Sequence, residues 1–390
     1  SALLGAAASS DGGMGGRVFV ENDGDITVYG DGSAAFLAQS INGGGGSLAL
    51  SFDGLSALPS LLLPDLPDIP IPGVPPTPGI PDIPTTGPIF EARLGGDDVA
   101  DMNAGLVEII STGTIGAAGN SAAGSVAQSI GGGGGVASIL ITLGVPVIEN
   151  PAQGLDGKLA ADAEMRAVDS QIRLGGLNGV NNGGNSLTHN HVGEILTNGI
   201  QSPGLIMQSI GGGGGRANVT IDAPAGSLLG LLDLGLGATG GLNENGGAVS
   251  RTHSGQVVTT GAMAPGAILQ SIGGGGGSAG VRLTGVEAAN AQIALTLGGS
   301  GSALSSGADV TGLFDGGLMT TGSNSVALLA QSIGAGGGET RVLGASGVTV
   351  SLGGQADAAG DAGAVSISNA GIIQSAGERS HGVLLQSIGG

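Results

Sequence analysis

The stretch Gln128-Ser129-Ile130, followed by the five glycines Gly131 to Gly135, decides how this chain is read. Gln-Ser-Ile occurs six times, and Asn42 and Ala335 each replace one glycine in their copies. Because the motif returns with the same surroundings, the sequence predicts a single repeat array over residues 1–390. The six Gln-Ser-Ile-glycine runs occupy residues 39–46, 128–135, 208–215, 270–277, 331–338 and 386–390.

The residues before each glutamine also repeat, without gaps. An aliphatic residue stands thirteen positions before it, with one glycine two positions earlier and another four positions later. Further upstream, apolar residues alternate with others, as in Val18 and Val20 or Val365 and Ile367, which is typical of a half-buried strand. The six aliphatic residues are Ile26, Ile115, Ile195, Val257, Leu318 and Ile373.

A Leu-Gly-Gly sequence or a near-copy of it closes a further apolar alternation, as in Val348, Val350 and Leu352. Each repeat therefore predicts a strand, a Leu-Gly-Gly turn, a strand, a glycine-punctuated turn and a strand that ends in Gln-Ser-Ile. The fold class that follows is all-β: an elongated repeat β-solenoid, like a parallel β-helix, with glycine-rich turns and loop insertions. With about three strands in a repeat of roughly 55 residues, we expect two or three coils from each repeat.

The spacing between successive glutamines falls from 89 residues to 55 along the chain, and the excess lies between the glycine run and Leu-Gly-Gly. Residues 58–88 are a proline-rich insertion that predicts a semi-rigid protruding loop, with a proline-rich ligand for an aromatic groove as the alternative. Residues 150–171 form a second insertion. Met165, Val168 and Ile172 have helical spacing there, but residues 171–176 align with a predicted strand, so we expect a strand at its end and a short helix before it.

The glycine runs are predicted to lie where two backbones pack almost directly on each other, rather than to be flexible linkers. The repeated glutamine is predicted to face inward and to bond backbone groups at a turn, with ligand contact as the alternative.

Composition excludes several classes of protein. The net charge of −20 disfavours nucleic acids and anionic membranes as partners, and the longest apolar run, residues 136–148, is too short to span a bilayer. Cysteine is absent, which excludes disulfides and thiolate metal sites. No signal peptide opens the chain, and both ends look like cuts in a longer array.

No residue set stands out as a catalytic, cofactor-binding or metal site. His189 and His191, with Glu194 nearby, are a candidate metal set, but His189 occupies a repeat position that holds Val20 and Ile109 elsewhere, which favours an ordinary strand residue. His253 and His381 read as isolated turn residues. The acidic clusters considered for Ca²⁺, none with a known calcium-loop spacing, are Asp23, Asp25 and Asp31, and Asp97, Asp98 and Asp101.

The pattern resembles the repeats of large bacterial autotransporter passengers and adhesin-like surface proteins. Gly255, Val257, Thr259 and Gly261, leading to Gln270-Ser271-Ile272, carry the resemblance, which covers the recurring core of the chain but not the proline-rich insertion. It implies a secreted passenger of a Gram-negative bacterium, built as a parallel β-solenoid and held at the outer membrane by a C-terminal barrel.

Together these observations predict a non-enzymatic extracellular protein: the structural and adhesive stem of a surface adhesin or fibre. The expected partners are further copies or a continuation of the same array, and a host or abiotic surface; no cofactor, nucleic acid or direct membrane insertion is expected. Two alternatives are a polysaccharide-processing enzyme on a β-helix scaffold and a ligand-binding module that acts through its insertion loops.

Overall fold

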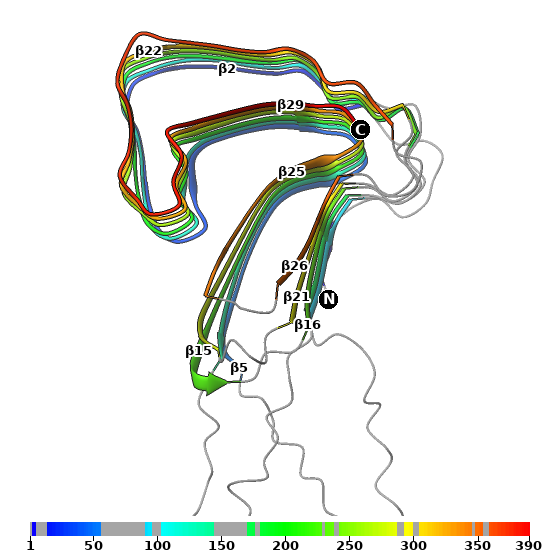
Figure 1. Cartoon of the computed structure of the whole chain (residues 1–390), viewed down its shortest axis with the longest axis vertical. Helices are drawn as coiled ribbons and strands as arrows, with labels where there is room; N and C mark the ends of the chain where they lie inside the picture. The colour runs from blue at the N-terminus through cyan, green and yellow to red at the C-terminus, as the bar shows by residue number, and fades with distance from the viewer. Residues whose placement is uncertain are drawn as a thin grey trace, which may run out of the picture.

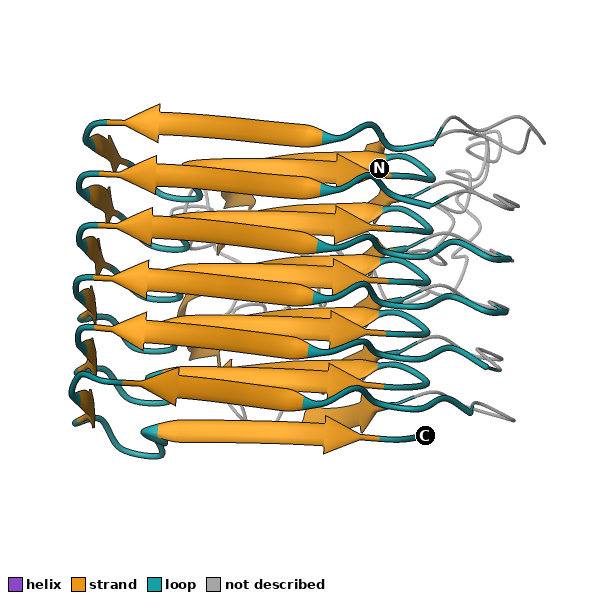
Figure 2. Ribbon diagram, turned by 90° about the horizontal axis from the view of Figure 1, so that it is seen from above, coloured by secondary structure: helices purple, strands orange, loops and turns teal. Residues whose placement is uncertain are grey.

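The computed structural model describes residues 2–4, 14–55, 90–95, 103–143, 170–175, 180–227, 231–237, 242–286, 292–298, 304–344, 348–353 and 359–390. These residues form a parallel β-solenoid, so the all-β solenoid prediction is confirmed. Seen from the side, the strands of successive coils lie above one another like rungs (Figure 2). Every repeat contributes one strand to each of five parallel sheets, except that sheet E below has five strands.

Three of the sheets enclose one hydrophobic core. Sheet B contains the predicted alternating strands, sheet C is a short corner, and sheet D carries the Gln-Ser-Ile motif. Sheet B comprises β2 (Val18–Asp23), β7 (Val107–Thr112), β12 (Leu187–Val192), β17 (Val249–Ser254), β22 (Val310–Asp315) and β27 (Val365–Asn369). Sheet C comprises β3 (Ile26–Tyr29), β8 (Ile115–Ala118), β13 (Ile195–Asn198), β18 (Val257–Thr259), β23 (Leu318–Thr320) and β28 (Ile373–Ser375). Sheet D comprises β4 (Ala34–Ile41), β9 (Ala123–Ile130), β14 (Leu205–Ile210), β19 (Ala267–Ile272), β24 (Leu328–Ile333) and β29 (Val383–Ile388).

The other two sheets enclose a second core. Sheet E starts inside the glycine runs, and sheet A ends at Leu-Gly-Gly. Sheet E comprises β5 (Gly45–Leu55), β10 (Gly134–Leu143), β15 (Gly214–Ser227), β20 (Gly276–Val286) and β25 (Gly337–Leu343). Sheet A comprises β1 (Ala2–Leu4), β6 (Phe90–Leu94), β11 (Ser170–Leu174), β16 (Leu231–Leu236), β21 (Gln292–Leu297) and β26 (Val348–Leu352).

Looking along the stack, each coil therefore has two thin lobes (Figure 1). Aliphatic side chains such as Ile109 and Leu205 fill the lobe of sheets B, C and D, and others such as Ile139 and Leu234 fill the lobe of sheets E and A. Sheet D lies between the lobes, because its other face, which includes Ile206, packs towards Val136 at the start of sheet E. Thin layers of this kind can be filled by aliphatic residues without large aromatic rings, which agrees with the aromatic content of 2%.

Two sequence predictions need correction. Each repeat forms one coil rather than two or three, since Gln128 pairs in register with Gln208 of the next repeat in the neighbouring strand. Two strands of each repeat were not predicted: the short strand of sheet C, which lies within the predicted glycine-punctuated turn, and the strand of sheet E, which begins with glycines but has alternating burial, as at Ala137 and Ile139.

The second insertion ends in a strand, as predicted, because Ser170–Leu174 is β11. The expected helix before it, at residues 150–169, lies outside the described residues, as does the proline-rich insertion at 58–88.

The glycine runs do pack backbone on backbone. Gly133 has a φ of +84°, and a Cβ atom there would lie 2.6 Å from the Cα atom of Gly95 in the Leu-Gly-Gly turn. A Cβ atom at Gly214 would overlap the carbonyl oxygen of Gly276 in the next coil. The flexible-linker interpretation is therefore wrong: the runs form the neck between the two lobes, and positions of close approach such as Gly133 and Gly214 require glycine.

We predict that Gly214→Ala destabilises the stack more than Gly46→Ala does. Both glycines have φ near +130°, a conformation that costs about 1–3 kcal/mol for other residues, but a Cβ atom at Gly46 meets no atom within 4 Å. The two variants thus share the backbone strain and differ in the clash. Chemical denaturation followed by circular dichroism measures the difference, and equal losses would contradict the close packing of the neck.

Candidate functional site

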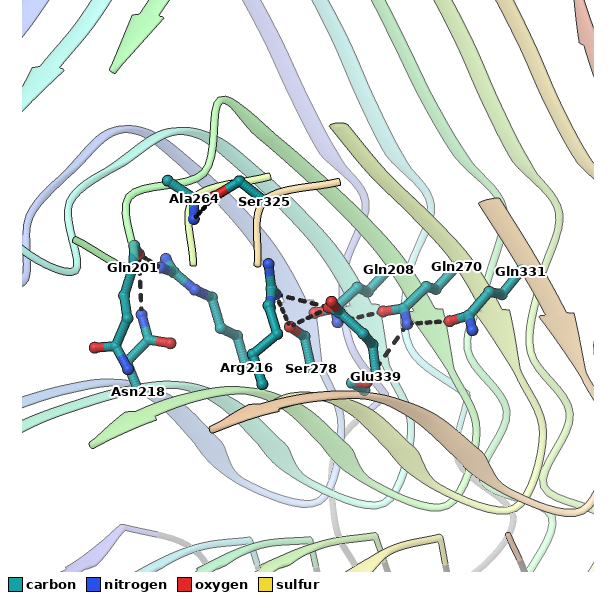
Figure 3. A network of polar contacts seen from close by, with 12 residues as sticks. Gln201, Gln208, Arg216, Asn218, Ala264, Gln270, Ser278, Ser325, Gln331 and Glu339 are labelled. Atoms are coloured by element: carbon teal, nitrogen blue, oxygen red, sulfur yellow. Dashed lines mark hydrogen bonds and ion pairs between the residues drawn. The ribbon is translucent and has the colours of Figure 1, made fainter. Parts of the chain in front are cut away.

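The repeated glutamines form a continuous ladder of hydrogen bonds between sheet D and the start of sheet E. Gln128 Nε2 donates to Gln208 Oε1 at 2.8 Å, and Gln208 Nε2 donates to Gln270 Oε1 at 2.8 Å. The same bond joins Gln39 to Gln128, Gln270 to Gln331 and Gln331 to Gln386. Figure 3 shows the Gln208, Gln270 and Gln331 part of this ladder.

The prediction that the glutamine faces inward is confirmed for the four middle copies, which are at most 3% exposed. Its second amide hydrogen reaches a backbone carbonyl of the glycine run, as in the 3.3 Å contact from Gln208 Nε2 to Gly215 O. The bond to the next glutamine was not predicted, because it becomes visible only once successive repeats are known to be adjacent strands.

Serine and isoleucine of the motif complete the contact between coils. Ser129 Oγ donates to Gly105 O of its own coil at 2.9 Å and accepts from Asn185 N of the next coil at 2.8 Å. The serine thereby joins sheet D to the entry of sheet B across two coils. Ile130, Ile210, Ile272 and Ile333 stack as a separate apolar column.

A second polar group lies beside the ladder on sheet E. Arg216 donates to Gln201 O at 2.7 Å, and Arg341 forms a 2.7 Å ion pair with Glu339. Arg341 Nη2 donates to Ser278 Oγ at 3.1 Å, and Ser278 pairs in register with Arg216 of the neighbouring strand (Figure 3). These groups are mostly buried. Arg216 joins sheet E to Gln201 in the turn between sheets C and D, here called the C–D corner, whereas Arg341, Glu339 and Ser278 bond one another within sheet E.

The histidines form a buried column in sheet B. His189 and His191 face the core, where the rings of His191 and His253 stack with centroids 5.3 Å apart. Arg251 is in register with His189 and contacts His253 Nδ1 at 3.1 Å. The assignment of His253 to a turn was wrong, since it lies in β17 in register with His191. His381 is exposed in the loop that leads into β29.

The proposed metal set is not assembled. Glu194 is exposed at the turn after β12, whereas His189 and His191 point into the core. Burial and the nearby Arg251 guanidinium lower the pKa of His191 to about 4, and burial lowers the pKa of Arg251 to about 9. Within the described residues no carboxylate pairs with Arg251, so this column would oppose a bound cation.

The first acidic cluster is dispersed over separate hydrogen bonds. Asp23 accepts from Thr112 Oγ1, Asp25 from Thr114 N and Asp31 from Asn120 N, each across to the second coil. No group of three His or acidic side chains that could hold a metal is found in the part of the chain that the structure describes. Asp97, Asp98 and Asp101 lie outside that part.

Glu244 was not singled out from the sequence. It is fully buried at the neck, its two carboxyl oxygens lack partners among the described residues, and burial raises its pKa to about 8. Its backbone N–H donates to Ser305 Oγ at 3.0 Å in the next coil. Ser305 occupies the same place in its coil as Glu244, so one coil has a carboxyl group where the next has a small hydroxyl group. Repeat alignment over this segment would have revealed it.

Comparisons of the chain with protein-family models, with curated proteins and with solved structures find no significant match. The resemblance to autotransporter repeats therefore stays a prediction. Among the described residues, no helix has the length and apolar character needed to cross a membrane.

We predict that Gln331→Ala lowers the free energy of unfolding by about 1–3 kcal/mol, because it leaves the amides of Gln270 and Gln386 each without one partner. Gln386→Ala is the matched control, since it removes one ladder bond at a partly exposed position. Urea denaturation compares the two. An interior variant as stable as the wild type would show that the ladder does not stabilise the stack.

We also predict that the contribution of Glu244 to stability declines as the pH rises from about 4.5 to about 8. The unfolded Glu244 carboxyl ionises near 4.5 while the folded one stays neutral up to about 8, so the unfolded state binds fewer protons in this window. Glu244→Gln removes this titration but keeps the shape. The free-energy difference between variant and wild type, measured by denaturation at several pH values, is expected to grow across the window and then level off; a constant difference would contradict the buried neutral carboxyl.

Proposed function

We propose that this chain is the repetitive, non-enzymatic stem of an extracellular bacterial surface protein, serving as a structural and adhesive fibre. The observation that carries the proposal is the glutamine ladder, which runs through all six coils with one direction of donation. Among the described residues, the ladder leaves the Oε1 of Gln39 at one end and the Nε2 of Gln386 at the other without a glutamine partner. Further coils, from the same array or from another copy, would therefore extend the stack without a change of pattern.

The outer surface supports the same proposal. Along the outward face of sheet B, Thr188, Ser250, Thr311 and Ser366 occupy one register column in the last four coils, and Phe19 and Glu108 occupy it in the first two. A row of short hydroxyl side chains is soluble at low charge and offers many weak hydrogen bonds to a surface. Secretion by a Gram-negative bacterium, attachment to its outer membrane, and a role in biofilm or host contact are part of this proposal and rest on the repeat resemblance.

A polysaccharide-processing enzyme is the competing hypothesis. It requires a pair of carboxyl groups flanking an accessible substrate site. Among the groups with shifted pKa values, His189, Arg251 and Glu244 are at most 1% exposed and therefore out of reach of a polymer, and the Glu339 carboxyl is paired with Arg341. Their positions favour the structural role.

We expect electron microscopy of the purified chain to show rods of uniform width that lengthen into filaments with concentration, and fibre diffraction to give a reflection at about 4.7–4.8 Å along the rod. Gln386→Arg, which adds a charge at the donor end of the ladder, is expected to shorten the filaments, whereas Thr252→Ala on the outer face of sheet B leaves them unchanged. Particles that never lengthen, for the wild type as for Gln386→Arg, would refute assembly by end addition.

A further inference from the structure

A groove of about 460 Å³ lies between the C–D corner and the outward face of sheet E. Its lining comes from four successive coils: Asp31 from the first, Asn120 from the second, Asp222 from the third and Arg282 from the fourth. The groove therefore runs along the stack axis, and its volume lies within the range of about 300–1,000 Å³ that small-molecule sites occupy.

Side-chain size explains why the groove is open here. Ser138 of the second coil is in register with Asn218 of the third. At the corner, Ser121 of the second coil and Gln201 of the third occupy equivalent positions. In the third coil, Gln201, Arg216 and Asn218 fill the space between the corner and sheet E and are 2%, 4% and 6% exposed. The first and second coils have Gly32, Ala49, Ser121 and Ser138 at the corresponding positions, and these small residues leave the space empty.

The groove wall is a fixed hydrogen-bonding surface. Ser121 Oγ and Thr220 Oγ1 both donate to Gln201 Oε1 at 3.1 Å, so their oxygen lone pairs remain available as acceptors. Gln201 Nε2 is buried and has no partner among the described residues. A side chain that is 2% exposed and held by two lining residues cannot rearrange freely, so the two hydroxyl groups that bond it are fixed in the groove wall.

Charged groups complete the lining. Arg282 Nη1 lies 3.3 Å from Asp222 Oδ1, which places a guanidinium and a carboxylate side by side. Asp31 uses one carboxylate oxygen to accept from Asn120 N at 2.7 Å. Two acidic groups against one basic group disfavour an anionic ligand, while Leu140 adds a small apolar area.

We propose that this groove binds an uncharged oligosaccharide that lies along the stack axis. Each sugar hydroxyl both donates and accepts, which matches a wall that alternates carboxylates, a guanidinium and serine or threonine hydroxyls. The Arg282–Asp222 pair suits two neighbouring hydroxyls, one accepting from the guanidinium and one donating to the carboxylate. A peptide that adds as a strand would need an unpaired strand edge, but β10, β15 and β20 of the wall are each paired on both sides.

This inference concerns one site and is independent of the stem function, since a stem can exist without it. Isothermal titration of the full chain with cellohexaose, maltohexaose and chitohexaose tests it, with hexagalacturonate as the anionic comparison. We expect at least one neutral hexasaccharide to bind. The double variant Ser121→Gln/Ser138→Asn gives the second coil the groove-filling residues of the third and is expected to weaken binding at least tenfold.

Arg282→Met is a second variant that removes the guanidinium without opening a large cavity, and it is expected to weaken binding to a similar extent. Thr252→Ala, on the exposed face of sheet B, is the control and should bind like the wild type. Circular dichroism confirms that each variant is folded. The proposal is overturned if no neutral hexasaccharide binds at millimolar concentration, if only hexagalacturonate binds, or if both folded groove variants bind as tightly as the wild type.

Discussion

The structure depends on one constraint: in a parallel stack in register, every side chain meets the residue at the same place in the coils above and below. A residue type can recur through all coils only if it interacts favourably with a copy of itself. Glutamine meets this condition because its amide both donates and accepts, and the bonds of 2.7–2.8 Å between neighbouring glutamines show the consequence. A column of like charges would repel itself, which accounts for a charged fraction of only 10%.

At the neck the constraint is steric, because there the backbones pack too closely for most side chains. Two lobes can share one continuous chain only if the backbone of the run passes close to the Leu-Gly-Gly turn, as Gly213 does where a Cβ atom would lie 2.7 Å from the Cα atom of Gly175. Ala335 shows that one position of the run accepts a residue other than glycine. It adopts a left-handed φ of +62°, next to Gly336, which keeps the glycine that the close approach requires.

The sequence allowed the fold class, the inward glutamine and the close packing of glycines to be predicted, because each depends on a pattern along the chain. Alternation at Val18 and Val20 marked sheet B, and the glycine run fused to Gln-Ser-Ile marked the neck. The strand of sheet E was missed because it begins with glycines, which weaken isolated strands but here fit between neighbouring backbones. The groove and the His253 contact were missed for a related reason. Both are formed by side chains of different repeats, so the sequence of a single repeat does not reveal them.

Columns in which the residue changes from coil to coil make the coils different from one another. Arg251 lies between His189 and Gly312, and a Cβ atom at Gly312 would already approach Ile367 Cδ1 to 2.7 Å, so the large and small residues of this column fit in one order only. A stack made solely of glutamine, serine and isoleucine columns would pair equally well in several orders or with other copies. Burial of Arg251 without a carboxylate partner costs stability, and we interpret this cost as the counterpart of a unique order of coils. The same departures from uniformity that set the order also leave the space beside Ser138, so the groove lies where a coil with small side chains adjoins one with the larger Gln201 and Asn218.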